Sequence, residues 1–179
     1  MNKSSKLSVR TMASVAMLAA VSFVLMLFDF SVPFMPGFIK MDFSELPALI
    51  GSFALGPVAG VMVCFVKNLL HLFVTSTGGV GELSNFVLGA VFVSVAGVIY
   101  KKNKTRKGAL IGIIVGAVVA LAVAIVGNII VTPFYAHMTT AQVVALIVPA
   151  LLPFNALKFT IHGVVTFLIY KPISNLLNR

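Results

Sequence analysis

The chain is poor in the residues on which most soluble proteins and enzymes depend. Only 9% of its 179 residues are charged and four are Asp or Glu, whereas 60% are hydrophobic. About a quarter of the residues are charged in an average soluble domain. This balance excludes an ordinary water-soluble fold and indicates one polytopic membrane domain.

Other absences narrow the chemistry. Cys64 is the only cysteine, so neither an intrachain disulfide nor a cysteine-based metal cluster can form, and we interpret it as a small packing residue. The sequence contains no P-loop, no G-x-S-x-G serine motif and no H-E-x-x-H zinc motif. No acidic pair lies inside an apolar stretch, where a metal site or a proton relay would need one. We therefore expect no enzymatic activity, no catalytic residue, no bound metal and no cofactor of its own.

The net charge of +9 comes mostly from basic clusters beside apolar stretches. Lys and Arg in such positions collect on the cytoplasmic side of membrane proteins and contact lipid headgroups. We therefore expect a lipid bilayer, and no nucleic acid, as the partner of these clusters. They are Lys3, Lys6 and Arg10; Lys101, Lys102, Lys104, Arg106 and Lys107; and Lys171 and Arg179.

The apolar stretches predict six membrane spans. Residues 43–75 could form one long helix or two shorter ones. Because the basic clusters place residues 10 and 101 on the same side, an even number of crossings must separate them, and Gly56-Pro57 is the natural break. The first span is followed by no signal-peptide cleavage pattern, so we expect it to be retained. We predict an all-α integral membrane protein with cytoplasmic N- and C-termini, one domain over 1–179, and spans at about 11–29, 45–56, 57–75, 82–100, 108–131 and 148–171.

Two connections on the predicted outer side are long. Residues 29–44 contain Pro33, Pro36 and Gly37, and residues 132–147 contain Pro133. Thr139-Thr140 is expected to cap a short interfacial helix in the second connection. Long loops of this kind are often lids or binding elements.

The polar residues of the spans gather in the predicted outer half of the membrane. An ionisable group in hydrocarbon costs roughly 2.5–3.5 kcal/mol on insertion scales, so such groups usually face one another, water or a ligand. Amides and a lysine suit a neutral ligand rich in heteroatoms, because they supply both donors and acceptors. The polar residues are Lys67, His71, Glu82, Asn85, Asn128, Asn155, Lys158 and His162.

Phenylalanines near this outer half would suit an aromatic ligand. They are Phe30, Phe34, Phe38, Phe43, Phe86, Phe134 and Phe154.

Structural roles remain open for many of these residues. Asparagines in membrane helices often form interhelical hydrogen bonds of about 0.6 kcal/mol. His71 and His162 are expected to pack or to form hydrogen bonds rather than to bind metal, and Lys67 is expected to pair with Glu82 or Asp42. Lys158 and Asn155 favour a functional role, because no acidic residue shares their helix.

Several short segments of the chain form a recognisable pattern. The first predicted helix contains Ala16 and Ala20 in an Ala-xxx-Ala spacing, which allows close helix approach to a partner or equally within the chain. The other segments are DFSELPALIG at 42–51, GPVAG at 56–60, KNLLH at 67–71, GELSNF at 81–86 and PFNALK at 153–158. Together these segments resemble the substrate-binding S components of energy-coupling factor (ECF) vitamin transporters, and among these the riboflavin-specific type.

The resemblance implies a riboflavin-binding transport subunit in a bacterial plasma membrane. It implies assembly with a transmembrane coupling protein and two cytoplasmic ATPase subunits that use ATP, with Ala16 and Ala20 as partner contacts. It also implies a riboflavin site near the outer face, closed by the loop between the first two helices. The ligand-binding residues that it implies are Asn128, Asn155, Lys158, Asn85, Glu82 and Asp42.

Three other functions stay open at this point. They are an S component for another vitamin, such as folate or thiamine; a self-sufficient secondary carrier or channel; and a scaffold whose polar residues only join helices.

Overall fold

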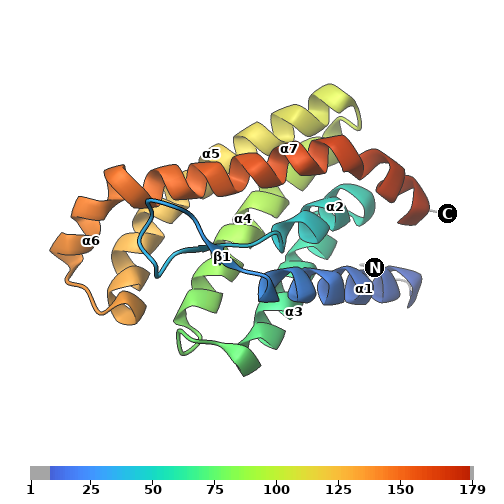
Figure 1. The fold of residues 1–179 in the computed structure, drawn as a ribbon. Coiled ribbons are helices and arrows are strands. Elements are labelled where there is room, and N and C mark those ends of the chain that lie inside the picture. Colours follow the sequence, from blue (N-terminus) through green and yellow to red (C-terminus); the bar gives the residue numbers. More distant parts are fainter. Residues whose placement is uncertain (1–8, 178–179) are drawn as a thin grey trace, which may run out of the picture.

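The computed structural model describes residues 9–177, so Lys3, Lys6 and Arg179 lie outside the described residues. The chain forms a helical bundle (Figure 1). A 3-10 turn, Leu72–Val74, extends α3, and a π-helical turn, Ile147–Leu151, joins α6 to α7. The helices are α1 (Val9–Leu27), α2 (Glu45–Leu55), α3 (Pro57–His71), α4 (Val80–Lys102), α5 (Arg106–Ala136), α6 (Thr140–Leu146) and α7 (Leu152–Leu177).

Within the described residues, five helical segments are long and apolar enough to cross a membrane. They are α1, Pro57–Val74, α4, α5 and Thr140–Leu177. The remaining helix, α2, has 11 residues. It is therefore roughly 16 Å long, which is about half of the hydrocarbon thickness. Most of α2 is buried by the surrounding helices, so it does not need to match the bilayer by itself. Six crossings stay a prediction.

Helices α2 and α3 meet at Gly56, where the sequence predicted a break. Gly56 has a φ of 106°, a conformation that glycine adopts without the steric cost of a side chain. Pro57 follows as the first residue of α3, where its missing N–H removes no helical hydrogen bond. This turn folds α2 and α3 into an antiparallel hairpin.

Both described ends of the chain lie at one end of the bundle. Arg10 Nη2 donates to the backbone oxygen of Leu177 at 3.3 Å, which joins the start of α1 to the end of α7. Figure 1 shows the turn between α4 and α5 at this end as well. Lys101 and Lys102, next to that turn, are exposed. This arrangement supports a common side for the basic clusters, and which side of a membrane it is remains a prediction.

The predicted second outer connection, 132–147, is wrong in its first part. Helix α5 continues through Pro133 and ends at Ala136. Proline interrupts one helical hydrogen bond, but Thr132 is fully buried and Tyr135 packs edge-on against Phe38, with ring centroids 6.1 Å apart. These tertiary contacts stabilise the last turn.

Thr139 caps α6, as expected from the sequence. Its side chain accepts from the backbone N–H of Gln142, and the Gln142 side chain accepts from the backbone N–H of Thr139. This reciprocal capping box satisfies donors that would otherwise be unpaired at the helix start. Only residues 137–139 separate α5 from α6.

The connection between α1 and α2 contains an antiparallel ribbon that the sequence did not predict. Strand β1 (Phe30–Ser31) pairs with β2 (Lys40–Met41). An exposed ion pair between Lys40 and Asp29, at 3.1 Å, supports the base of the ribbon. In Figure 1 the segment extends from α1 toward α7 before it returns to α2.

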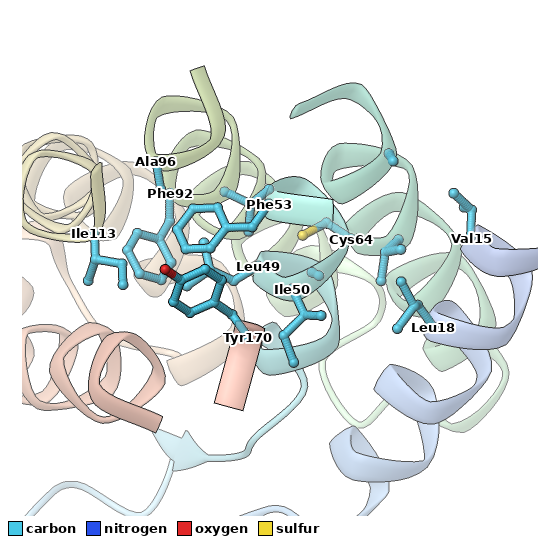
Figure 2. Close-up of a cluster of buried hydrophobic side chains, with 14 of the residues drawn as sticks. Val15, Leu18, Leu49, Ile50, Phe53, Cys64, Phe92, Ala96, Ile113 and Tyr170 are labelled. Carbon is cyan, nitrogen blue, oxygen red and sulfur yellow. The ribbon is translucent and has the colours of Figure 1, made fainter. Parts of the chain in front are cut away.

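The hydrophobic core lies between α2, α4, α5 and α7 and continues to α1 and α3 (Figure 2). Phe53 packs against Tyr100 and Tyr170, with ring centroids 4.5 and 5.4 Å apart. Cys64 is fully buried in this core, consistent with its predicted packing role. Close approach of α4 and α5 depends on Gly112, since a Cβ there would lie 2.7 Å from the backbone oxygen of Ala96.

Candidate functional site

One cavity of about 330 Å³ lies at the end of the bundle opposite the described chain ends. Its size falls near the lower limit of small-molecule pockets, roughly 300–1,000 Å³. All four acidic residues of the chain line it: Asp29, Asp42, Glu45 and Glu82. Every Asp and Glu side chain of the protein therefore lies around a single cavity.

The six residues predicted to bind ligand all line this cavity. The segment before α2, the start of α4, the end of α5 and the start of α7 each contribute. The residues are Asp42, Glu82, Asn85, Asn128, Asn155 and Lys158. The fold thus brings together residues far apart in sequence, and their contact with a ligand remains a prediction.

Local hydrogen bonds orient two of the amides. Asn128 Oδ1 accepts from Thr132 Oγ1 at 3.2 Å, which leaves the Asn128 amino group as a donor for the cavity. Asn155 Nδ2 donates to the backbone oxygen of Leu151 at 2.8 Å, which leaves the Asn155 carbonyl as an acceptor. The two asparagines therefore offer complementary groups.

Lys158 has acidic partners, although none lies on its own helix. Its ammonium donates to Asp42 Oδ2 at 3.1 Å and lies 3.4 Å from Glu45 Oε2. Burial alone would raise the pKa of Asp42, but the ammonium groups of Lys158 and Lys67 and hydrogen bonds from Ser44 outweigh burial and hold that pKa below its ordinary value. Asp42 therefore stays ionised and ties the segment before α2 to α7.

The prediction that Lys67 pairs with Glu82 or Asp42 is wrong. The fully buried Lys67 ammonium donates to Glu45 Oε1 at 2.7 Å and to the hydroxyl of Ser44. The α2–α3 hairpin causes this pairing, because Glu45 and Lys67 are equally distant from Gly56 along antiparallel helices. Glu45 was absent from the predicted site, and its position relative to Gly56 was the signal that could have identified it.

His162 is a hydrogen-bonded histidine, as expected. Its Nε2 donates to the backbone oxygen of Asp42 at 2.8 Å, and its ring packs edge-on against Phe43. His162 Nδ1 and Glu45 Oε2 are buried and have no hydrogen-bond partner among the described residues. His162 therefore helps to fix Asp42, and the second oxygen of Glu45 is left to Lys158.

A second polar network lies on another wall of the cavity. His71 Nδ1 donates to Glu82 Oε1 at 2.8 Å, and Thr77 Oγ1 donates to Glu82 Oε2 at 2.7 Å. Both carboxylate oxygens are therefore held by the end of α3 and the connection to α4. This network orients Glu82 without a buried lysine.

The apolar walls differ in part from the prediction. Phe38 and Phe154 line the cavity as expected, and Phe159, which was not predicted, also lines it. The other predicted phenylalanines lie elsewhere: Phe30 and Phe43 pack together, Phe86 packs against Phe65, and Phe34 and Phe134 are exposed.

The site is arranged for binding. Within residues 9–177, no group of three or more His, Cys, Asp or Glu side chains is placed to hold a metal ion. The buried carboxylates are matched by lysines or by hydrogen bonds, and the amides point to a partly apolar cavity. Such a lining suits a neutral ligand with flat apolar surfaces and several polar atoms.

The alanines of α1 were expected either to contact a partner or to pack within the chain, and their exposure distinguishes these two roles. Ala16 and Ala20 are exposed, whereas Ala19 is fully buried. The Ala-xxx-Ala pair therefore does not pack within the described chain, and its small side chains leave a flat strip on the outside of α1.

Comparison with known sequences identifies relatives along almost the whole chain. The family model described as "ECF transporter, substrate-specific component" matches residues 10–170. The riboflavin transporter RibU of Staphylococcus aureus (strain TCH60) is 34% identical, over 95% of this chain and 93% of the relative. The riboflavin transporter FmnP of Bacillus subtilis (strain 168) is 31% identical, over 92% of both chains.

Solved structures agree with this grouping. A structure of the S component of a bacterial ECF transporter superposes with a TM-score of 0.82 at 34% identity, and covers 95% of this chain and 98% of the other. The fold also matches that of ThiT from Listeria monocytogenes, with a TM-score of 0.68 at 15% identity over 93% and 96% of the two chains. The second likeness concerns the fold alone.

Proposed function

Because this chain belongs to the family of ECF transporter substrate-specific components, we propose that it binds riboflavin and presents it for ATP-driven import. A substrate-specific component is a transport subunit, so the chain is not an enzyme. Riboflavin is its transported ligand, and ATP is used by partner subunits.

One observation carries the proposal. The cavity gathers Asn128, Asn155 and Lys158 from two helices, in a chain that is 34% identical to a riboflavin transporter over nearly its full length. The similarity to riboflavin transporters indicates which ligand to expect, and the cavity contains donors and acceptors that fit riboflavin.

The chemistry of riboflavin matches the lining. Its isoalloxazine ring is flat and largely apolar, and Phe38, Phe154 and Phe159 supply aromatic walls. The carbonyls and the N–H at one edge of the ring need both donors and acceptors. The Asn128 amino group and the Lys158 ammonium are donors, and the Asn155 carbonyl is an acceptor. The other polar groups of the cavity can meet the ribityl hydroxyls.

The proposed setting is a bacterial cell membrane, with the described chain ends in the cytoplasm and the cavity toward the outside. Exposed lysines beside the α4–α5 turn support this orientation. The proposed partners are a transmembrane coupling protein and two cytoplasmic ATPase subunits. Ala16 and Ala20, exposed on α1, are the proposed contact with the coupling protein.

The absorbance spectrum of the purified protein tests the ligand. We expect protein extracted in mild detergent from flavin-containing bacteria to stay yellow after washing, with close to one riboflavin per chain. A colourless preparation that also fails to quench added riboflavin fluorescence would refute the proposal.

Two controls separate the neighbouring functions. Thiamine and folate, added in excess, should not displace riboflavin; displacement by either would favour a component for that vitamin. In proteoliposomes, uptake should require the coupling protein, the ATPase subunits and ATP. Uptake by the chain alone would instead identify a self-sufficient carrier.

A further inference from the structure

Four buried charged groups form a continuous row beside the cavity. In order they are Lys67, Glu45, Lys158 and Asp42, which we call the charge row. Lysine and carboxylate alternate, and the formal charge of the row is zero. Lys67 lies at its closed end and is fully buried, whereas Lys158 and Asp42 lie at the cavity.

Glu45 divides its carboxylate between the two lysines. Oε1 accepts from Lys67 at 2.7 Å, and Oε2 lies 3.4 Å from Lys158. Oε2 is inaccessible to solvent and has no hydrogen-bond partner among the described residues. A buried acceptor without a hydrogen bond needs an explanation. The Lys158 ammonium lies 3.4 Å from Oε2, and His162 Nδ1 lies 3.8 Å from it.

The distances show how the Lys158 ammonium is held between the carboxylates of Asp42 and Glu45. Its ammonium is nearer to Asp42, at 3.1 Å, than to Glu45, at 3.4 Å. An ammonium has three donors. One goes to Asp42 Oδ2, whereas Glu45 Oε2 attracts the ammonium by charge without accepting a hydrogen bond. The remaining donors are left for the cavity. Since Lys67 holds Glu45 more closely, at 2.7 Å, Glu45 steadies Lys158 without drawing it away from the cavity.

We propose that Glu45 and Lys67 are positioning residues for Lys158, and that together they direct an N–H of its ammonium that no carboxylate accepts toward a carbonyl or hydroxyl of the ligand. The inference rests on the proposed function, because riboflavin is the ligand with which it is tested. Lys67 does not line the cavity. Glu45 lines it but is only 1% exposed, and its two oxygens are buried against Lys67 and Lys158, so both residues act through Lys158 rather than by touching the ligand. A lysine side chain has a long flexible stem, and a second carboxylate fixes its direction.

A charge-matched pair of substitutions tests the proposal. Glu45→Leu with Lys67→Met removes one negative and one positive charge, and replacing a buried ion pair by apolar residues is often neutral for stability. We expect this variant to unfold near the wild-type temperature without ligand and to bind riboflavin about tenfold more weakly. Folded protein with wild-type affinity would overturn the proposal.

A conservative variant distinguishes positioning from charge balance. Glu45→Gln with Lys67→Met is equally neutral but returns an acceptor for Lys158, so we expect it to recover most of the lost affinity. If the row only balanced charge, the two neutral variants would bind alike. Equal affinity of these variants would therefore count against positioning.

A Lys158→Met background supplies the matched control. If Glu45 acts through Lys158, then Glu45→Gln should weaken riboflavin binding severalfold in the wild-type chain and leave it nearly unchanged when Lys158 is already replaced. This comparison does not depend on the leucine variant, and the loss of the Lys67 ion pair, which Glu45→Gln causes in both backgrounds, cancels between them. Equal losses in both backgrounds would overturn the proposal.

The same titrations separate this inference from the proposed function. Failure of the wild-type chain to bind riboflavin would refute the proposed function. Tight wild-type binding that is insensitive to Glu45 and Lys67 would refute only their positioning role.

Discussion

The two ends of the bundle are built in different ways. The packed end contains the start of α1, the α2–α3 and α4–α5 turns and the end of α7, and it is held by apolar contacts. The pocket end contains the segment before α2, the start of α4, the end of α5 and the start of α7. It has a smaller apolar cluster, and ion pairs and hydrogen bonds hold the side chains around the cavity. Close packing is thus found at one end of the bundle, and the open cavity lies at the other.

The difference teaches which interactions can support a cavity. Dispersion contacts need atoms on both sides, so an apolar end gains stability only by leaving no space. Directed polar contacts fix side chains at defined positions around a cavity that remains open. Substitutions at the packed end should therefore affect folding, and those at the pocket end should affect ligand binding.

The largest of the four effects is a loss of stability, expected on substitution of Gly112 at the packed end. Gly112→Ala should lower the free energy of unfolding by about 1–3 kcal/mol, because its Cβ would lie 2.7 Å from the Ala96 backbone oxygen and force α4 and α5 apart. Thermal unfolding of the ligand-free protein measures this loss. Gly127→Ala on the same helix is the control, since its added Cβ would meet no atom within 4 Å apart from its chain neighbours and the backbone of its own helix. Equal unfolding temperatures would show that the packed end tolerates added volume.

At the pocket end, Asn155→Ala or Lys158→Ala should weaken riboflavin binding at least tenfold, or by about 1.4 kcal/mol. Each substitution removes a polar group that lines the cavity. Titration by flavin fluorescence quenching measures the affinity. Asn155→Ala should change the unfolding temperature far less than Gly112→Ala does. Wild-type affinity in both variants would place the ligand elsewhere.

A smaller effect is expected at His71. His71→Ala removes one of the two hydrogen bonds that hold Glu82 at the cavity, so binding should weaken by about 0.5–1.5 kcal/mol. The same fluorescence titration measures it. His137→Asn is the control, because His137 is exposed, does not line the cavity and has a φ of 53° that asparagine tolerates. If His137→Asn weakened riboflavin binding as much as His71→Ala does, the effect of His71→Ala would not be due to the Glu82 network, and this prediction would be wrong.

The smallest effect on the isolated chain is expected at Ala16. Ala16→Trp should leave folding and riboflavin binding nearly unchanged, since Ala16 is exposed, but should abolish ATP-driven uptake in proteoliposomes with the partner subunits. Ala19→Trp, one turn along and fully buried, should instead disrupt folding. Normal uptake by the Ala16 variant would exclude this strip of α1 from the partner contact.

Local sequence patterns predicted much of the fold and of the site. The break at Gly56-Pro57 and the cap at Thr139 depend on backbone preferences of single residues, and both occur where the sequence indicated. The polar residues at one end of the helices were recognisable because polar groups are costly within apolar spans. The six ligand-binding residues that the family resemblance implied all line one cavity.

The ribbon of β1 and β2 and the continuation of α5 through Pro133 could not be predicted in the same way. Strands of two residues show no periodicity, and proline normally argues against a helix. In the structure, contacts between Tyr135 and Phe38 join the end of α5 to the ribbon segment. Both features therefore depend on packing between segments nearly a hundred residues apart.

The sequence by itself determined the membrane character, the helical class, the hairpin break and the family, because composition, periodicity and short motifs are local properties. Only the tertiary structure decided which charges meet. Lys67 pairs with Glu45 across the hairpin, and Lys158 reaches Asp42 from the other end of the chain. A buried charge needs a partner of opposite sign, but the sequence does not state which helices are neighbours, and the packing of the bundle chooses the partner.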